Sequence, residues 1–317
     1  MRVLLAIDGS PSSDAARDLL TSLDWPEGTS VRVVGIVDVT NPALLGYSPY
    51  VVPYVDLRDV ERSLDATLTD VADALQVAGL QADRTLLRGR PGSRIVEAAV
   101  EFGAELIILG SRGMGRIESM LLGSVSAEVV DHAPCAVLVA RSDTVGRILV
   151  ATDGSVTAGL AVDHLASTSY LARVPVEVIA VAPTIGQAGP ISEPEITDQV
   201  LRIYADEARE ARKHAEAIAA SAARRLADAG RTVRWSISVG DAAREIIETA
   251  SCLHCDLVVV GSRGLTGLRR ILLGSVARNV LLHTHASVLV VRDSTPVASD
   301  RVGVAAPAES TEVSAAI

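Results

Sequence analysis

The stretch that decides the fold reads Gly110-Ser-Arg-Gly-Met-Gly-Arg-Ile-Glu-Ser-Met-Leu-Leu-Gly-Ser-Val125, and it returns later as Gly261-Ser-Arg-Gly-Leu-Thr-Gly-Leu-Arg-Arg-Ile-Leu-Leu-Gly-Ser-Val276. Nine of the 16 positions are identical. In both copies a short apolar run precedes the first glycine, and a helical pattern surrounds the final Gly-Ser-Val step. Such a loop is typical of an anion site, because glycine lets a phosphate approach backbone N–H groups without a Cβ in the way.

A second repeated segment lies upstream of each glycine stretch. Val3-Leu-Leu-Ala-Ile-Asp8-Gly9-Ser10 recurs 145 residues later as Ile148-Leu-Val-Ala-Thr-Asp153-Gly154-Ser155, whereas the glycine stretches are 151 residues apart. The difference of six residues, 151 minus 145, falls between the second and third strands, where we expect a longer helix in the second copy. The chain therefore consists of two tandem copies of one structural unit.

The two copies divide the 317 residues into two domains and a tail. We place the first domain at 1–143 and the second at 144–293. Residues 294–317 are rich in Ala, Ser, Pro and Val without any period, which predicts a disordered tail.

Short β-branched runs alternate with helical patterns in each copy, which predicts parallel strands joined by crossover helices. The strand runs are apolar throughout, so we expect helices on both faces of each sheet. The predicted fold class is α/β, with two tandem doubly wound five-stranded sheets that are mainly parallel. In the first copy we expect strands at 2–8, 31–37, 84–87, 106–110 and 136–140, and helices at 12–23, 56–77, 93–102 and 119–131.

Composition and charge exclude several classes of protein. The chain has 29 basic and 39 acidic residues, a net charge of -10, which disfavours nucleic acid and anionic membranes as partners. Lys213 is the only lysine and does not follow a glycine, so a G-x-x-x-x-G-K-[ST] phosphate loop is excluded. The apolar runs are far shorter than the roughly 20 residues of a membrane-spanning helix. Because no export segment precedes the first strand, we expect a cytoplasmic protein.

The spacing Gly-x2-Gly-x9-Gly-Ser, after a strand-end Asp-Gly-Ser, resembles the ATP-binding branch of the universal stress protein family. The resemblance extends to about residue 293 and implies a tandem two-domain member with Rossmann-like domains of the adenine nucleotide alpha hydrolase-like kind. By analogy with the family, the adenosine part of ATP is expected at Asp8, Ile36 and Gly110, and at Asp153, Val181 and Gly261. The phosphates are expected at Gly113, Gly123, Ser124, Val125 and Ser126, and at Gly264, Gly274, Ser275 and Val276.

The same resemblance implies how the protein works. The aspartates would contact adenosine, the backbone of Ile36 and Val181 would hold the adenine edge, and Gly110 and Gly261 would lie beside the ribose. Mg²⁺ would be held mainly through the phosphates. The fifth strands would pair to form an internal pseudo-dimer, with an unknown protein partner and a possible further homodimer. The implied function is a stress-response protein whose ATP occupancy alters its conformation or its choice of partner.

Two alternatives are a slow ATPase and a cyclic AMP-binding protein. The glycine segments offer arginines but no paired carboxylates or positioned glutamine as a catalytic base, which favours a binding module over an enzyme. The intact phosphate spacing favours the triphosphate over cyclic AMP.

Plainer interpretations exist for individual residues. Asp8 and Asp153 could only start the following helix, and Ser124 could be a simple cap. Cys252 and Cys255 have metal or redox spacing, but no second pair completes a zinc site, so no metal ligand is assigned.

The two sites differ at one position of the motif. Ser126 follows Gly-Ser-Val in the first copy, where the second copy has Ala277. If Ser126 donates to a phosphate, the first site binds nucleotide more tightly. If its hydroxyl only faces its own helix, the difference is silent.

Overall fold

Strands β5 and β10 join the two halves of the protein into one sheet. The computed structural model describes residues 1–40, 56–113, 122–185, 198–264 and 273–292. Its ten strands lie in the order β3-β2-β1-β4-β5-β10-β9-β6-β7-β8. Every neighbouring pair is parallel except β5 and β10, which are antiparallel. The α/β prediction is confirmed, and the two expected sheets are continuous. The predicted tail lies outside the described residues.

Strands and helices alternate in each half. The first half contains β1 (Arg2–Ala6), α1 (Pro11–Ser22), β2 (Ser30–Val37), α2 (Leu57–Val77), β3 (Gln81–Arg88), α3 (Pro91–Phe102), β4 (Leu106–Gly110), α4 (Ser124–His132) and β5 (Ala136–Ala140). The second half contains β6 (Ile148–Ala151), α5 (Val156–Ser167), β7 (Val176–Ala182), α6 (Asp198–Asp228), β8 (Val233–Val239), α7 (Ala242–Cys252), β9 (Leu257–Gly261), α8 (Ser275–His283) and β10 (Ser287–Val291).

Some predicted boundaries need correction. Strand β3 is longer than the expected 84–87, because it pairs with β2 along its whole length. Strand β1 ends at Ala6 rather than at Asp8, whose carboxylate accepts a hydrogen bond from the Ser10 amide in the turn that follows. The fourth helix begins at Ser124, after Gly123, rather than at residue 119.

The strand register confirms where the offset between the copies changes. Val31 pairs with Val3 in the first half, as Val176 pairs with Ile148 in the second, which preserves the offset of 145. Across the next pair of strands, Ala82 is equivalent to Val233, 151 residues later. The added residues belong to the segment that contains α6, which has 31 residues against 21 in α2.

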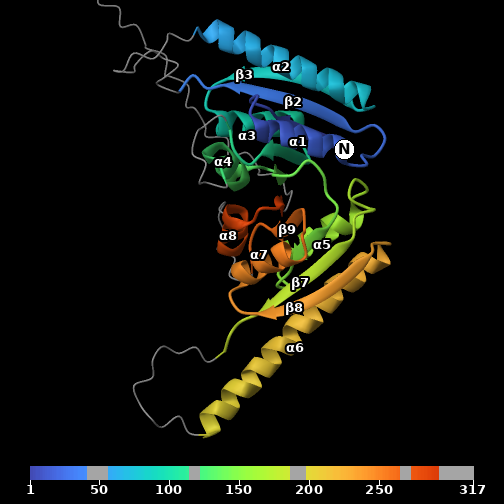
Figure 1. The fold of residues 1–317 in the computed structure, drawn as a ribbon, viewed down its shortest axis with the longest axis vertical. Helices are drawn as coiled ribbons and strands as arrows, with labels where there is room; N and C mark the ends of the chain where they lie inside the picture. Colours follow the sequence, from blue (N-terminus) through green and yellow to red (C-terminus); the bar gives the residue numbers. More distant parts are fainter. Residues whose placement is uncertain (41–55, 114–121, 186–197, 265–272, 293–317) are drawn as a thin grey trace, which may run out of the picture.

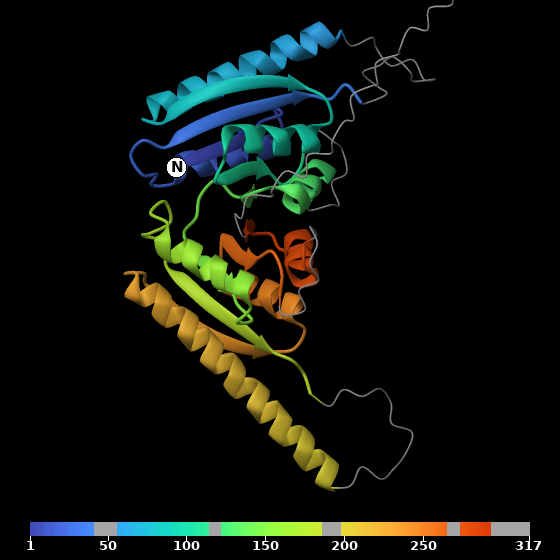
Figure 2. The same cartoon turned by 180° about the vertical axis from the view of Figure 1, so that it is seen from behind.

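Two layers of helices cover the two faces of the sheet. The apolar residues of α1, α2, α5 and α6 pack in one cluster, and those of α3, α4, α7 and α8 pack in another on the opposite face. Figures 1 and 2 show α2 and α6 at the two ends of the molecule, with the arrowheads of β2 and β7 pointing to the same side. The carboxyl ends of β2 and β7 therefore face the same side of the protein, although β5 and β10 run in opposite directions at the junction.

The junction between the halves is an approximate twofold axis. Leu138 of β5 lies opposite Leu289 of β10, and these residues occupy the same place in the two copies, 151 positions apart. Trp25 stacks on Tyr170 at 4.6 Å between ring centroids, and these two are also equivalent, 145 positions apart. The predicted pairing of the fifth strands is confirmed.

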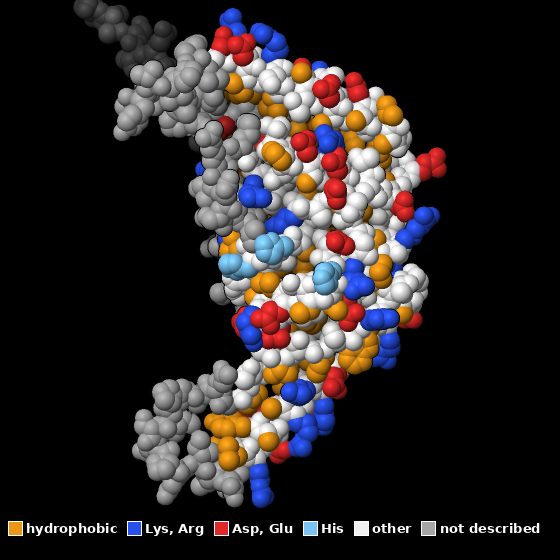
Figure 3. Space-filling view, in the orientation of Figure 1, with side chains coloured by type: hydrophobic (Ala, Val, Ile, Leu, Met, Phe, Trp, Pro, Cys, Tyr) orange, Lys and Arg blue, Asp and Glu red, His pale blue; other side chains and the backbone are white. Residues whose placement is uncertain are grey.

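None of the helices in the described part combines the length and the hydropathy needed to cross a bilayer. Acidic and basic side chains are interspersed over both halves on the face drawn in Figure 3.

The ends of α3 and α7 differ in backbone strain. Gly103 closes α3 in the left-handed region with φ of 63°, whereas the equivalent residue after α7 is His254 with φ of 50°. A residue with a Cβ is strained there.

Cys255, the residue after His254, is buried. This burial raises the pKa of its thiol to about 11, so the thiol is protonated at neutral pH.

We expect His254→Gly to raise the free energy of unfolding by about 0.5 to 1 kcal/mol, because relief of left-handed strain exceeds the entropy that glycine adds to the unfolded chain. Urea denaturation measures the change. Gly103→Ala is the matched control and should lower stability, since it introduces the same strain. A His254→Gly protein no more stable than the wild type would contradict the assignment of strain.

Candidate functional site

The candidate site lies where the order of strands reverses. Strand β1 sits between β2 and β4, and β6 sits between β7 and β9. In open α/β sheets such a switch point leaves a crevice at the carboxyl ends of the strands. Asp8 follows β1, and Gly110 ends the neighbouring β4, so the sheet brings these predicted residues to one crevice. Asp153 and Gly261 occupy the same positions in the second half.

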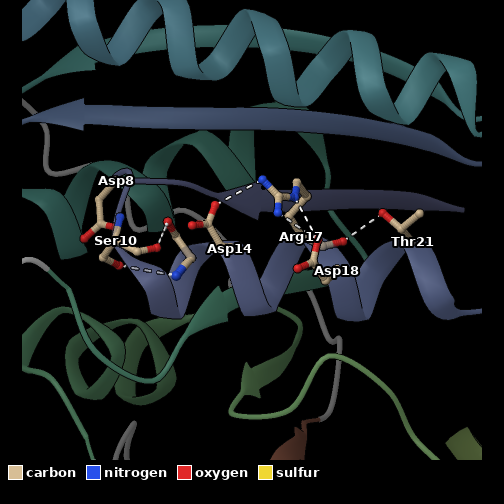
Figure 4. Close-up of polar contacts among 7 residues, drawn as sticks. Asp8, Ser10, Asp14, Arg17, Asp18 and Thr21 are labelled. Atoms are coloured by element: carbon tan, nitrogen blue, oxygen red, sulfur yellow. Dashed lines mark hydrogen bonds and ion pairs between the residues drawn. The ribbon is translucent and has the colours of Figure 1, made fainter.

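An aspartate and a glycine approach each other closely in both crevices. The Asp8 Oδ1 accepts a hydrogen bond of 3.0 Å from the Ser10 amide, and its Oδ2 would lie only 2.7 Å from a Cβ at Gly113. Figure 4 shows Asp8 and Ser10 at the start of α1. In the second half Asp153 Oδ2 would lie 2.8 Å from a Cβ at Gly264. A side chain at residue 113 or 264 would therefore require the aspartate carboxylate to move from this position.

Gly110 and Gly261 serve helix packing. A Cβ at Gly110 would lie 2.5 Å from the carbonyl of Ser12 in α1, and one at Gly261 would lie 2.5 Å from the carbonyl oxygen of Thr157 in α5. The backbone of each helix cannot move aside for it. This packing accounts for both glycines, and their predicted contact with ribose stays a prediction.

A hydrogen bond brings the two ends of each glycine loop together. The Gly123 amide donates to the Ser111 carbonyl at 2.7 Å, and the Gly274 amide donates to the Ser262 carbonyl at 2.8 Å. A Cβ at Gly123 would lie 3.4 Å from the Cα of Arg112. Residues 114–121 and 265–272, between these ends, are outside the described residues. The Gly-x2-Gly and Gly-Ser parts of the motif thus meet in space.

The helices that follow these loops have no side-chain cap. Gly123 and Gly274 are the N-cap residues of α4 and α8, and neither can offer an oxygen from a side chain. By contrast, Ser10 and Ser155 cap α1 and α5 through their hydroxyl groups. The first N–H groups of α4 and α8, together with the positive end of the helix dipole, can therefore receive an anion or water.

The residues of these first turns are accessible. Their backbone N–H groups are those predicted to contact phosphate. Ser124, Ser275 and Val276 are exposed, and Val125 is half-buried.

The structure gives the Ser126 hydroxyl a partner within the protein. Its side chain is 3% exposed, and its hydroxyl donates to the Gly110 carbonyl at 2.8 Å. This bond ties α4 to the end of β4, and a phosphate would have to compete with it for the single hydroxyl proton. The phosphate contact of Ser126 and the tighter first site stay predictions that this hydrogen bond does not favour.

The backbone of Ile36 and Val181 faces the crevice. The Ile7 amide donates to the Val34 carbonyl beyond the end of β1. On the other side of β2, the Val37 carbonyl accepts a hydrogen bond from the Gly89 amide, which follows β3. In a strand, the backbone N–H and C=O groups of alternate residues point to the same neighbouring strand. The backbone groups of Ile36 therefore point toward the β1 side, beyond the last residue of β1. Val181 has the same relation to β6, since the Thr152 amide donates to Ile179.

Arginines lie near the ends of both glycine loops. Burial, together with the nearby charge of Arg112, lowers the pKa of Arg141 to about 10. The pKa of Arg292 is lowered by burial and by Arg263, while Asp131 opposes this change. These groups remain charged at neutral pH, so the loops lie in a cationic environment.

Comparisons with known proteins agree with this architecture. A family model described as the universal stress protein family matches residues 1–141 and 144–292. A universal stress protein of Mycobacterium tuberculosis is 30% identical over 307 residues, covering 92% of this chain and 97% of that protein. One from Thermus aquaticus is 34% identical over 140 residues, covering 44% of this chain and 97% of the relative.

Solved structures show the same fold. A universal stress protein from Archaeoglobus fulgidus aligns with a TM-score of 0.61 at 21% identity, covering 92% of this chain and 98% of the other. A protein of unknown function from Pseudomonas aeruginosa aligns with a TM-score of 0.60 at 19% identity, covering 92% of both chains.

We expect Ser126→Ala to lower the free energy of unfolding by about 1 kcal/mol, because the variant loses a buried hydrogen bond. The affinity for nucleotide should change little. Ser124→Ala, which removes an exposed hydroxyl from the same turn, is the matched control for stability. Thermal melts and a nucleotide titration separate the two roles, and a Ser126→Ala protein of normal stability but weakened affinity would support the phosphate contact.

Proposed function

Because the chain belongs to the universal stress protein family, we propose that it binds one ATP in each half and acts as a nucleotide-dependent stress-response module. The observation that carries the proposal is the uncapped start of α4 and α8 beside an aspartate and glycine pair, present twice. An uncapped helix start among glycines suits a phosphate chain. The arginines near the loop ends add to the attraction for an anion.

Each part of the nucleotide has a counterpart in the crevice. The outward backbone of Ile36 or Val181 offers a donor and an acceptor to the adenine edge. The carboxylate of Asp8 or Asp153 can accept a hydrogen bond from a ribose hydroxyl. The loop ends and the first turn of α4 or α8 would hold the phosphates through backbone N–H groups. These assignments are supported by their common position at the switch point.

Mg²⁺ would accompany the phosphates. Among the described residues no group of three or more His, Cys, Asp and Glu side chains could hold a metal ion. In the proposed complex the ion would retain several waters and be held mainly by phosphate oxygens. The role of the protein is then to bind and orient the nucleotide. A change in conformation or in the choice of a protein partner, within the cytoplasm, is the proposed consequence of occupancy, and a further homodimer is an additional proposal.

We expect native mass spectrometry and calorimetric titration with Mg-ATP to give two nucleotides per chain. A non-hydrolysable analogue should bind equally well, since the site is built for binding. Tighter binding of cyclic AMP would favour the cyclic nucleotide instead. Turnover above about 1 s⁻¹, the low end of ordinary enzymes, would replace the binding module with an ATPase. Absence of binding at millimolar nucleotide would contradict the proposal.

We expect Gly113→Leu to abolish binding in the first half, and Gly264→Leu to abolish it in the second, so that each variant retains one nucleotide per chain. The added side chain would displace the aspartate carboxylate and fill the space beside the phosphates. Gly79→Leu is the control for an added leucine away from both crevices, because Gly79 lies after α2 and no described residue comes within 4 Å of a Cβ built there. Its positive φ, which Gly113 and Gly264 lack, lets Gly79→Leu lower stability but gives no reason for a change in stoichiometry. Stoichiometry is measured by titration, and a fold check by circular dichroism accompanies it.

A further inference from the structure

Two half-buried arginines reach across the junction between the halves. Arg141 follows β5 and donates through Nη1 to the Ala286 carbonyl at 3.0 Å and through Nη2 to the Leu281 carbonyl at 2.6 Å. Arg292 follows β10 and donates through Nη2 to the Val130 carbonyl. The arginines are equivalent, 151 residues apart, as are Val130 and Leu281. Neither arginine was among the predicted site residues, although their recurrence at this offset is visible in the sequence.

The acceptor carbonyls need a donor from outside their helices. Val130 and Leu281 lie in the last turns of α4 and α8, where carbonyls have no N–H from a following turn. In α4 the residue four positions after Val130 is Pro134, which has no N–H at all. A guanidinium supplies the missing donor, and its positive charge suits the negative end of the helix dipole.

These helices are the ones that begin at the candidate nucleotide sites. Helix α4 starts at the Gly123 turn, and α8 starts at the Gly274 turn. Each has nine residues and acts as a short rigid rod. An arginine that fixes the far end of α4 therefore also fixes where its first N–H groups lie, and this arginine comes from the second half.

Each arginine is also attached to the glycine loop of its own half. The Ser111 amide donates to the Ala140 carbonyl at 3.1 Å, and Arg141 is the next residue. The Ser262 amide donates to the Val291 carbonyl at 2.9 Å, and Arg292 is the next residue. A short path thus runs from the loop of one site to the helix of the other, in both directions.

We propose that Arg141 and Arg292 are positioning residues, each of which holds the nucleotide site of the opposite half in its binding geometry. Arg292 serves the first site through α4, and Arg141 serves the second through α8. The inference rests on the proposed nucleotide binding. It makes each site dependent on the presence of the other half.

The two arginines should not contribute equally. Within its own half α4 is also held by the Ser126 bond to Gly110 and by Glu128, which accepts from Ser93 at 3.0 Å and pairs with Arg90. The equivalent residues of α8 are Ala277 and Asn279, which cannot form the same bonds. The ion pair between Asp131 and Arg278, at 2.8 Å, joins α4 to α8 and holds both helices equally. Helix α8 therefore depends more on Arg141 than α4 depends on Arg292.

The test uses full-length chains that retain one site. Gly264→Leu leaves the first site and Gly113→Leu leaves the second. Arg141→Met and Arg292→Met are each placed in both backgrounds, and the Kd for Mg-ATP is measured by calorimetry. Arg84→Met is the matched control, because Arg84 lies on the edge strand β3 and bonds Asp65 within the first half. Thermal melts report folding, and Arg→Lys variants restore a cationic donor.

A crossed pattern is expected. Arg292→Met should weaken the first site and spare the second, and Arg141→Met should weaken the second site and spare the first, by roughly three- to thirtyfold in Kd. The larger loss should follow Arg141→Met, the lysine variants should recover part of it, and Arg84→Met should change neither site.

Other patterns would overturn the inference. Loss confined to the site of the same half, equal loss at both sites, or unchanged affinity would each do so. If the methionine variants do not fold, the lysine variants must show the same crossed pattern at smaller size, and otherwise the inference fails. A wild-type chain that binds no ATP would overturn the proposed function itself, whereas normal wild-type binding without a crossed pattern overturns only the positioning role.

Discussion

The antiparallel pairing of β5 with β10 is the constraint on which the rest of the structure depends. Both strands are buried along their whole length, so either half alone would expose an apolar edge strand with unpaired backbone groups. Their pairing removes two such edges at once. Because Leu138 faces its equivalent Leu289, equivalent elements of the two halves lie side by side along the axis. The stack of Trp25 on Tyr170 and the two arginines that cross the junction follow from this geometry.

A side chain would meet a different neighbour at each glycine of the repeated motif. Gly110 allows β4 to approach the backbone of α1, Gly113 leaves room for the Asp8 carboxylate, and a Cβ at Gly123 would contact the Arg112 backbone at 3.4 Å. The second half repeats all three contacts at the same places. A cradle made of backbone N–H groups requires such close approaches, because those groups must converge on one anion. Packing and ligand binding therefore call for glycine at the same positions, and the sequence motif alone does not separate them.

Features encoded locally could be predicted, and features that depend on distant partners could not. The repeat, the α/β class, the change in offset and the bounds of β4 and β5 follow from short patterns and from comparing the copies. The length of β3 was missed because an exposed edge strand carries polar residues that give no apolar run. The bond from Ser126 to Gly110 joins residues 16 positions apart, and that from Arg141 to Leu281 joins residues 140 apart. No local pattern identifies those partners, and the same motif therefore predicted a phosphate contact for Ser126.

The two halves have the same residues at the candidate anion site and differ in the residues that pack beside it. Both have the aspartate beside a glycine and a helix without a side-chain cap. Around the Asp-Gly turn they diverge. A Cβ at Gly154 would lie 3.1 Å from Ile218 of α6, whereas one at Gly9 would have no described residue within 4 Å. The longer helix α6 thus packs against the turn of the second half, and no described residue takes this place in the first half. The two proposed nucleotide sites would therefore share their ligand chemistry and differ in the helix beside the Asp-Gly turn.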